Sequence, residues 1–157
     1  MIDLLASIEG SALAAWTRES TSIWAYPTIL TLHTFGLAIV VGANAVVDFR
    51  LLGVASRIPI STLRSLFPIM WWAFALNFIT GIVLFMSDAT TKYGQRVFWI
   101  KLGLIALALL VTRPVWNGVR LQDDSPAPVA ARLRTLAILS LVMWTAAIIA
   151  GRLLAYL

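Results

Sequence analysis

The sequence predicts an all-α protein, a transmembrane four-helix bundle preceded by an N-terminal interfacial amphipathic helix. Four apolar stretches fill most of the 157 residues, and each is long enough to cross a hydrocarbon core about 30 Å thick. The composition agrees, since 61% of the residues are hydrophobic and only 12% are charged, which is unlike a soluble domain. A chain of this length forms a single integral membrane domain, residues 1–157.

Residues 1–20 predict the interfacial helix. Within residues 2–17, apolar side chains gather on one side of a helix and polar side chains on the other: Leu4, Leu5, Ile8, Ala12, Ala15 and Trp16 against Asp3, Ser7, Ser11 and Arg18. Such a helix lies in the plane of the membrane surface. The alternative is an ordinary packing helix that contacts the bundle or a partner.

The four spans follow in order. The first is expected at about residues 27–49, because the fixed φ of Pro27 suits the first turn of a helix. The second is expected at about 66–86, with Trp71 and Trp72 near the aromatic belt. The third is expected at about 98–112, with Pro114 at its end or at a kink. A connection of turn-forming residues, 122–128, precedes the fourth span at about 133–155.

The net charge of +5 reflects basic residues in the short connections, so we interpret them as topology signals and lipid contacts, with no nucleic-acid partner. Seven basic residues flank the connections after spans one and three, and five lie on the opposite side: Arg50, Arg57, Arg64, Arg113, Arg120, Arg132 and Arg134 against Arg18, Lys92, Arg96, Lys101 and Arg152. The positive-inside rule then predicts a multi-pass protein of the cell inner membrane with both termini on the non-cytoplasmic side.

The absence of cysteine excludes disulfides, thiolate metal sites, iron–sulfur clusters and covalent c-type haem attachment. The chain also lacks a His-x-x-x-His pair and a glycine-rich phosphate loop, so hydrolase and nucleotide chemistry have no support. The sequence therefore favours a protein that is not an enzyme, although quinone chemistry beside the single histidine, His33, stays open.

Polar residues inside the spans recur at helical spacing. His33 and Asn44 are eleven residues apart, close to three turns, and Asp48 follows one turn later. Asn77 and Asp88 have the same spacing in and after the second span, and Lys101 and Thr112 have it in the third. Polar groups in hydrocarbon are costly unless they face a bundle interior and find partners. We therefore expect a polar interior that includes Asn44, Asp48, Arg50, Asn77 and Asp88.

These residues fall into two layers by depth. One layer holds His33, with Asp88, Lys101 and Arg152 approaching the same membrane face. The opposite layer holds Asp48 and Arg50, and we expect Asp48 to pair there with an arginine such as Arg113 or Arg134. The alternative for all these charges is interfacial anchoring and snorkelling.

The chain resembles an uncharacterised family of small bacterial four-span membrane proteins, known as a domain of unknown function. The resemblance covers nearly the whole chain and rests on Tyr26-Pro27, His33, Gly42, the Asp48–Gly53 segment, Thr80-Gly81, Leu84-Phe85, Asp88-Ala89, Phe98 and Lys101. It implies the fold and the membrane location but no activity. A looser likeness to b561-type and copper-resistance-type four-helix membrane proteins rests on the bundle and one histidine. Those cytochromes supply paired histidines, so ligation of haem by two histidines of one chain is excluded.

Three functions follow as hypotheses. The first is a non-catalytic accessory or structural subunit of a membrane complex, or a small homo-oligomer. The second is a b-type haem protein with His33 as the axial metal ligand. Its sixth ligand would be Met86 or the His33 of a second protomer, and Arg152 or Lys101 would pair with the propionates. The third is proton or small-solute transport by an oligomer through His33, Asp88 and Lys101.

Overall fold

The computed structural model describes residues 2–54, 56–121, 129–154 and 156. The predicted connection 122–128 and the predicted end of the fourth span at residue 155 lie outside these residues. Four long helices dominate the fold: α3 (Tyr26–Leu52), α5 (Leu66–Met86), α7 (Arg96–Leu121) and α8 (Ala131–Leu153). All four are long and apolar enough to cross a membrane, and the described residues contain no strand. The all-α, four-span prediction is confirmed.

Four short helices connect or precede the long ones: α1 (Ile2–Glu9), α2 (Ala12–Glu19), α4 (Ile60–Leu63) and α6 (Ala89–Gly94). The expectation of one continuous N-terminal helix is wrong, because the segment breaks at Gly10 and Ser11. Ser11 caps α2 by accepting a hydrogen bond from the Ala14 N–H at 3.4 Å, and a cap of this kind favours a new helix start over continuation. The placement of these helices in the membrane interface stays a prediction.

The third span extends further than the sequence indicated. It was expected to end near residue 112, yet α7 continues to Leu121 with Pro114 inside it. Proline removes one backbone hydrogen bond from a helix. Val115 and Val119, which follow it, are both buried in the bundle, and this packing compensates for the lost bond. Pro114 therefore does not mark the end of the helix.

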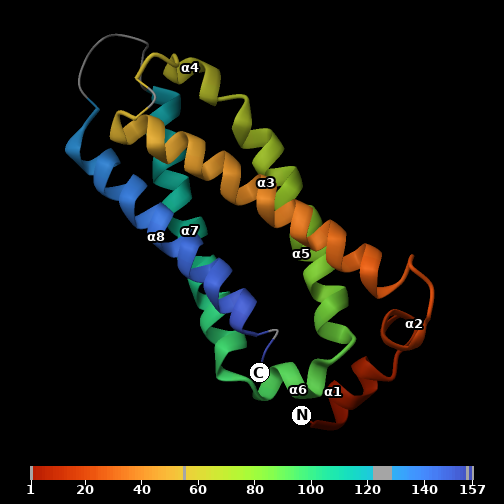
Figure 1. Cartoon of the computed structure of the whole chain (residues 1–157). Helices are drawn as coiled ribbons and strands as arrows, with labels where there is room; N and C mark the ends of the chain where they lie inside the picture. The colour runs from red at the N-terminus through yellow and green to blue at the C-terminus, as the bar shows by residue number, and fades with distance from the viewer. Residues whose placement is uncertain (1, 55, 122–128, 155, 157) are drawn as a thin grey trace.

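The long helices are arranged in the order α5, α3, α8, α7. Helix α3 packs along α5 on one side and along α8 on the other, and α8 packs along α7 (Figure 1). Helices α5 and α7 meet through stacked aromatic pairs near their two ends. Phe67 stacks on Trp116 with ring centroids 4.8 Å apart, and Phe85 stacks on Phe98 with centroids 5.1 Å apart.

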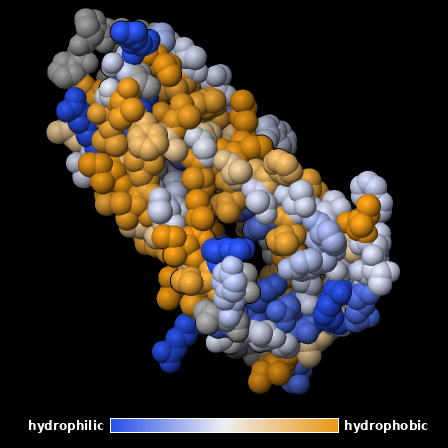
Figure 2. Space-filling view, viewed as in Figure 1, coloured by the Kyte–Doolittle hydropathy of each residue, from blue (hydrophilic) through white to orange (hydrophobic). Residues whose placement is uncertain are grey.

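The two ends of the bundle differ in packing. The main cluster of buried apolar side chains lies towards the end where α3 finishes, and includes Val47, Leu51, Leu63, Phe67 and Val119. At the other end the long helices diverge, and α1, α2 and α6 lie across the opening (Figure 1). Apolar side chains cover the flanks of the bundle, as a lipid-facing surface requires, and hydrophilic ones gather near its ends (Figure 2). This divergence creates the space described next.

Candidate functional site

A pocket of about 630 Å³ occupies the divergent end of the bundle. All four long helices contribute to its wall, because α3 and α7 begin at this level and α5 and α8 end there. A hollow with hydrophilic side chains beside it is visible on this part of the surface (Figure 2). Its polar lining consists mainly of five side chains: Arg18, His33, Asp88, Lys92 and Lys101. Its apolar lining includes Tyr26, Leu30, Leu84, Phe85, Phe98 and Leu154.

His33 is half-buried in the wall of the pocket and is held through one ring nitrogen. Its Nδ1 lies 3.0 Å from the backbone oxygen of Asn77 and 3.1 Å from Thr80 Oγ1. Because a carbonyl oxygen only accepts, Nδ1 carries the hydrogen and donates it. The hydroxyl of Thr80 donates to the backbone oxygen of Leu76 at 2.7 Å, so its oxygen also faces Nδ1 as an acceptor.

This tether leaves the second ring nitrogen of His33 free. All hydrogen bonds of the ring to described residues involve Nδ1, and in this tautomer Nε2 has an unshared electron pair. The Asn77 amide lies 3.3 Å from Nδ1, but two donors do not bond, and its Nδ2 instead donates to the His33 backbone oxygen at 2.7 Å. The ring is therefore oriented by α5, with Nε2 available to a ligand.

Two glycines permit this arrangement. A Cβ added at Gly36 would lie 3.0 Å from the Ala73 backbone oxygen and 3.1 Å from Asn77 Cβ, so glycine allows α3 and α5 to approach closely. A Cβ added at Gly81 would lie 3.1 Å from His33 Cε1. Gly81 thus leaves the space in which the imidazole sits. Gly81 borders the His33 ring itself, and Gly36 allows α3 to approach Asn77, whose backbone oxygen holds that ring.

Positive charge predominates around the pocket. Lys101 is half-buried, and its Nζ makes no hydrogen bond to a described residue; a Cβ added at Gly151 would lie 3.4 Å from Lys101 Cε. Lys92 Nζ donates to the backbone oxygen of Leu84, and burial lowers the pKa of this ammonium. Asp88 is half-buried and contributes the acidic group of the lining. Arg18 also lines the pocket but is paired with Glu9 and Glu19. The two lysines against one carboxylate make the pocket suited to an anion.

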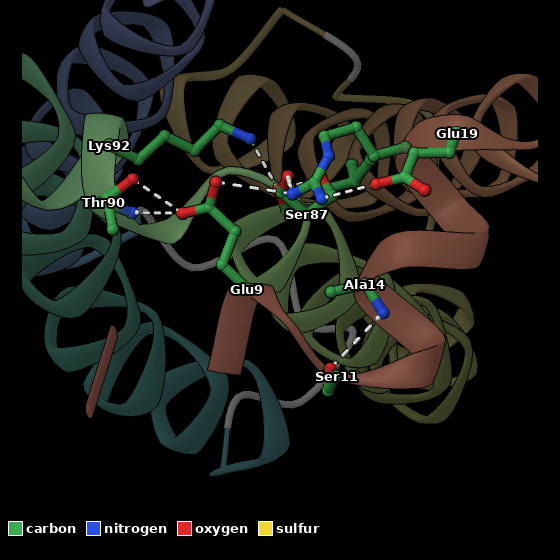
Figure 3. Close-up of polar contacts among 9 residues, drawn as sticks. Glu9, Ser11, Ala14, Glu19, Ser87, Thr90 and Lys92 are labelled. Atoms are coloured by element: carbon green, nitrogen blue, oxygen red, sulfur yellow. Dashed lines mark hydrogen bonds and ion pairs between the residues drawn. The ribbon is translucent and has the colours of Figure 1, made fainter. Parts of the chain in front are cut away.

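The N-terminal helices close one side of this pocket through a pair of contacts that we call the N-terminal clasp, formed by Glu9 and Arg18 (Figure 3). Glu9 Oε2 accepts hydrogen bonds from the Thr90 N–H at 3.0 Å and from its hydroxyl at 2.6 Å. These bonds, together with the nearby charge of Arg18, hold the pKa of Glu9 below its usual value.

Arg18 completes the clasp from α2. Its Nη1 donates to the Ser87 backbone oxygen at 3.2 Å and lies 3.4 Å from Glu9 Oε1. Its Nη2 donates to Glu19 at 2.8 Å, and this bond raises the pKa of the guanidinium further. Arg18 thereby joins the N-terminal segment to the end of α5 while its side chain lines the pocket.

The structure brings together part of the set that the sequence proposed for a cofactor. His33 and Lys101, with Asp88, line one pocket, whereas Met86 and Arg152 do not belong to its lining. Arg152 is exposed, and its Nη2 donates to the Tyr156 hydroxyl at 2.7 Å with the guanidinium 5.0 Å from the ring centroid. Sequence reasoning missed Lys92 and Arg18 as pocket residues, because both read as surface charges until α6 and α2 fold over the opening.

Comparison with known proteins places the whole architecture in one family. A family model matches residues 7–157, and its description is a family of unknown function, DUF6644. The chain belongs to this family. No curated protein and no solved structure matched the chain. The recognition made from the sequence is confirmed, and the family adds no activity to the geometry described above.

The opposite end of the bundle contains a second set of polar side chains, and these are buried away from solvent. Asn44 is buried, donates from Nδ2 to the Val40 backbone oxygen at 2.8 Å, and accepts from Thr112 Oγ1 at 3.2 Å. Asp48, one turn further, is 1% exposed. The predicted pairing of Asp48 with an arginine is not found among the described residues: the ion pairs there join Arg18 to Glu9 and Glu19.

The arginines at that end of the bundle do not pair with Asp48, and there is a physical reason for this. Arg113 and Arg134 are exposed at the surface, where a guanidinium keeps its hydration. Arg50 Nε donates to the Ile58 backbone oxygen, so it anchors the connection after α3. The described residues contain no group of three or more histidine, aspartate or glutamate side chains placed to hold a metal ion.

Proposed function

We propose that this protein is a non-catalytic membrane component that binds an anionic, metal-containing amphiphile in the His33 pocket, and that this ligand is haem b. The observation that supports the proposal is the tether of His33 Nδ1 to the Asn77 carbonyl at 3.0 Å. Histidines that bind metal characteristically donate their other ring N–H to a carbonyl or carboxylate. The tether fixes the tautomer that presents Nε2 to iron.

The distribution of charge supports an amphiphile. His33 lies roughly 10 Å below the start of α3, and Lys101 lies roughly 7 Å below the start of α7. Arg18 and Lys92 lie outside the long helices. A ligand with an apolar body and two carboxylates at one edge would place its body beside His33 and its carboxylates towards these cations. The pocket volume of about 630 Å³ is within the usual range for small-molecule sites.

The pocket lining offers one imidazole as a ligand for the iron. His33 is the one histidine of the chain, and Met86 is not in the pocket wall. His33 would therefore be the side chain by which a single protomer ligates the iron, and a second ligand would come from a small molecule or from the His33 of a second protomer. Haem bound in this way supplies one-electron chemistry, and the role of the chain is to hold and orient it.

An absorption experiment tests the proposal. The wild-type protein, purified in detergent from cells supplied with haem, is expected to show a Soret band that shifts on reduction by dithionite. The His33→Ala variant should lose the band, and imidazole added to that variant should restore part of it. A wild type that stays colourless, and that does not bind added haemin, would refute the proposal.

A second control separates the charges from the iron ligand. Lys101→Met keeps the length of the side chain and removes the charge that faces the propionates. We expect weaker haemin binding with an unchanged spectrum of the bound form. Arg152→Met is the matched comparison, since Arg152 lies outside the pocket lining, and it should bind haemin as the wild type does.

The transport hypothesis keeps one supporting observation, because His33, Asp88 and Lys101 line the same pocket. The other half of the bundle is filled by buried apolar side chains, so a path across the membrane requires an oligomer. A pH-dependent flux into proteoliposomes that is lost in His33→Ala would support transport. If the pocket binds haem and does not conduct protons or solutes, proteoliposomes that contain the haem-free wild-type protein should show no such flux.

We further propose that the protein resides in the bacterial inner membrane as a homo-oligomer or a subunit of a larger complex, with the pocket facing the non-cytoplasmic side. The arginine distribution supports this orientation. Because the chain has no cysteine, single cysteines report topology cleanly. Thr21→Cys at the pocket end should react with an impermeant thiol reagent in intact cells, and Ser56→Cys should react only after the cells are permeabilised.

A further inference from the structure

Among the described residues, one buried carboxyl group without a hydrogen-bond partner lies at the end of the bundle away from the pocket. Asp48 is fifteen residues beyond His33 on α3, roughly 22 Å along the helix. Its side chain is 1% exposed, and both carboxyl oxygens lack a hydrogen-bond partner among the described residues. Buried polar groups are nearly always satisfied in folded proteins. The carboxyl of Asp48 therefore requires an explanation that the haem proposal does not provide.

Ser140 of α8 faces this carboxyl across the contact between α3 and α8. Ser140 is also 1% exposed, and its Oγ likewise has no formed hydrogen bond to a described residue. One hydroxyl and one carboxyl group thus lie opposite each other, both sealed from solvent. A small rotation of either side chain would join them.

Charged groups that could neutralise Asp48 are absent from the helices around it or point away. Helices α4 and α5 contain no titratable side chain. On α3, Arg50 is engaged with the Ile58 backbone oxygen. The remaining cations on α7 and α8 are exposed at the same end or lie at the pocket end: Arg113, Arg120, Arg132 and Arg134 at the first, and Arg96, Lys101 and Arg152 at the second. His33 is also at the pocket end.

An ionised carboxylate in this position would be costly. It offers only acceptors, and burial without donors or a countercharge is strongly unfavourable in a membrane interior. A carboxylic acid has one donor as well as acceptors, and a serine hydroxyl can both donate and accept. The neutral pair can therefore satisfy itself, whereas the ionised pair leaves acceptors unmatched.

We propose that Asp48 and Ser140 form a proton-binding site, in which Asp48 carries a proton at neutral pH and exchanges a hydrogen bond with Ser140. A proton suits this site better than a metal ion, because a cation needs several oxygen ligands and the described residues around Asp48 offer no second carboxylate. Release of the proton would leave an unpaired carboxylate between α3 and α8. The close contact of these two helices at Asp48 therefore requires the protonated form.

Infrared difference spectroscopy of the full-length protein in detergent tests the site. The chain has seven acidic residues, and the proposal places a proton on one of them, Asp48. The wild type should then show the carbonyl stretch of a protonated carboxyl group, which shifts in heavy water. Asp48→Asn should abolish that band, and the matched control Asp88→Asn should retain it. Absence of the band from the wild type, or its persistence in Asp48→Asn, would overturn the proposal.

Two further measurements keep the assignment testable if Asp48→Asn folds poorly. Ser140→Ala should move the wild-type band to higher frequency, because a carbonyl released from a hydrogen bond stretches at higher energy. An unmoved band would remove Ser140 from the site. The wild type is also measured in sodium buffer and in choline buffer. A band that appears only when sodium is withheld would show that the site holds a sodium ion and would overturn the assignment to a proton.

Discussion

His33 and Asp48 lie at opposite ends of α3, and the two ends of the bundle surround them in opposite ways. At the divergent end, His33 is half-buried, tethered through Nδ1, and borders a pocket with cationic walls. At the packed end, Asp48 is sealed and has no charged partner. Helical spacing alone assigns both residues to the interior. The separation of the helices decides which one can meet a ligand and which one can hold only a proton.

Removing an aromatic ring from each end gives the largest expected contrast. Phe67 is 2% exposed and stacks on Trp116 at the packed end, so Phe67→Ala should lower the free energy of unfolding by about 3–5 kcal/mol. Phe98 stacks on Phe85 but borders the pocket, and Phe98→Ala should cost less than half as much. Denaturation in detergent, followed by tryptophan fluorescence, measures both. Equal losses would show that the ends are packed alike.

Two glycines of α3 test how close the helices approach. An added methyl at Gly36 would meet the Ala73 backbone oxygen at 3.0 Å, whereas one at Gly42 would meet nothing within 4 Å. Gly36→Ala should therefore destabilise the protein by about 1–3 kcal/mol through overpacking. Gly42→Ala should be neutral or stabilising by up to about 1 kcal/mol, since alanine is the better helix former.

The same unfolding assay compares the two glycine variants. Gly36→Ala should also weaken haemin binding, because separation of α3 from α5 breaks the tether between His33 and Asn77. A Gly36→Ala protein with wild-type stability and wild-type haemin affinity would contradict the close contact that the structure shows.

The buried polar side chain of Asn44 at the packed end should contribute a smaller amount to the free energy of unfolding. Asn44 joins α3 to α7 by accepting from Thr112 at 3.2 Å, and hydrogen bonds between membrane helices average about 0.6 kcal/mol. Asn44→Leu should therefore lower the free energy of unfolding by about 1 kcal/mol or less, and it should leave haemin binding unchanged. Loss of haemin binding in this variant would show that the two ends are coupled.

The N-terminal clasp is expected to make the smallest contribution to stability, and this contribution depends most on pH. Its hydrogen bonds from Thr90 depress the pKa of Glu9, so the folded state binds this proton less readily than the unfolded state. The contribution of Glu9 to the stability of the folded state is therefore present above pH 4.5, and it is lost as the pH falls through the lower pKa that Glu9 has in the folded state. Hydrogen exchange at the Thr90 amide, compared between wild type and Glu9→Gln at each pH, should differ at neutral pH and converge in acid.

A difference that persists at acidic pH would show that the clasp does not depend on the charge of Glu9. Glu19→Gln provides the matched control, because Glu19 contacts Arg18 but makes no bond to Thr90. This variant should leave the Thr90 exchange near the wild-type rate throughout the pH range.

Much of the architecture could be predicted from composition and spacing. The second span was placed at residues 66–86, as observed, and the first and fourth begin within two residues of α3 and α8. The third span was cut short at Pro114, because local sequence shows the missing N–H but not the buried contacts of Val115 and Val119 beyond it. A predicted helix boundary is wrong where tertiary packing outweighs a local sequence signal such as a proline.

The candidate site was only partly predictable. His33 and Lys101 follow from the rarity of titratable groups within apolar helices, a signal that any single sequence carries. Arg18 and Lys92 reach the pocket only because α2 and α6 fold across its opening, and no local pattern encodes that fold. Met86 and Arg152 were expected from depth alone, which ignores the direction of a side chain around its helix.

The sequence by itself determined that the surroundings are a lipid bilayer, that four long helices cross it, and which polar residues lie inside the spans. These follow from the cost of placing backbone and side-chain polar groups in hydrocarbon, which any chain must meet segment by segment. The tertiary structure alone decided that His33 presents a free nitrogen to a cationic pocket while Asp48 faces only Ser140. That outcome depends on how four helices diverge at one end and pack at the other, and such distances are set by contacts between segments far apart in the chain.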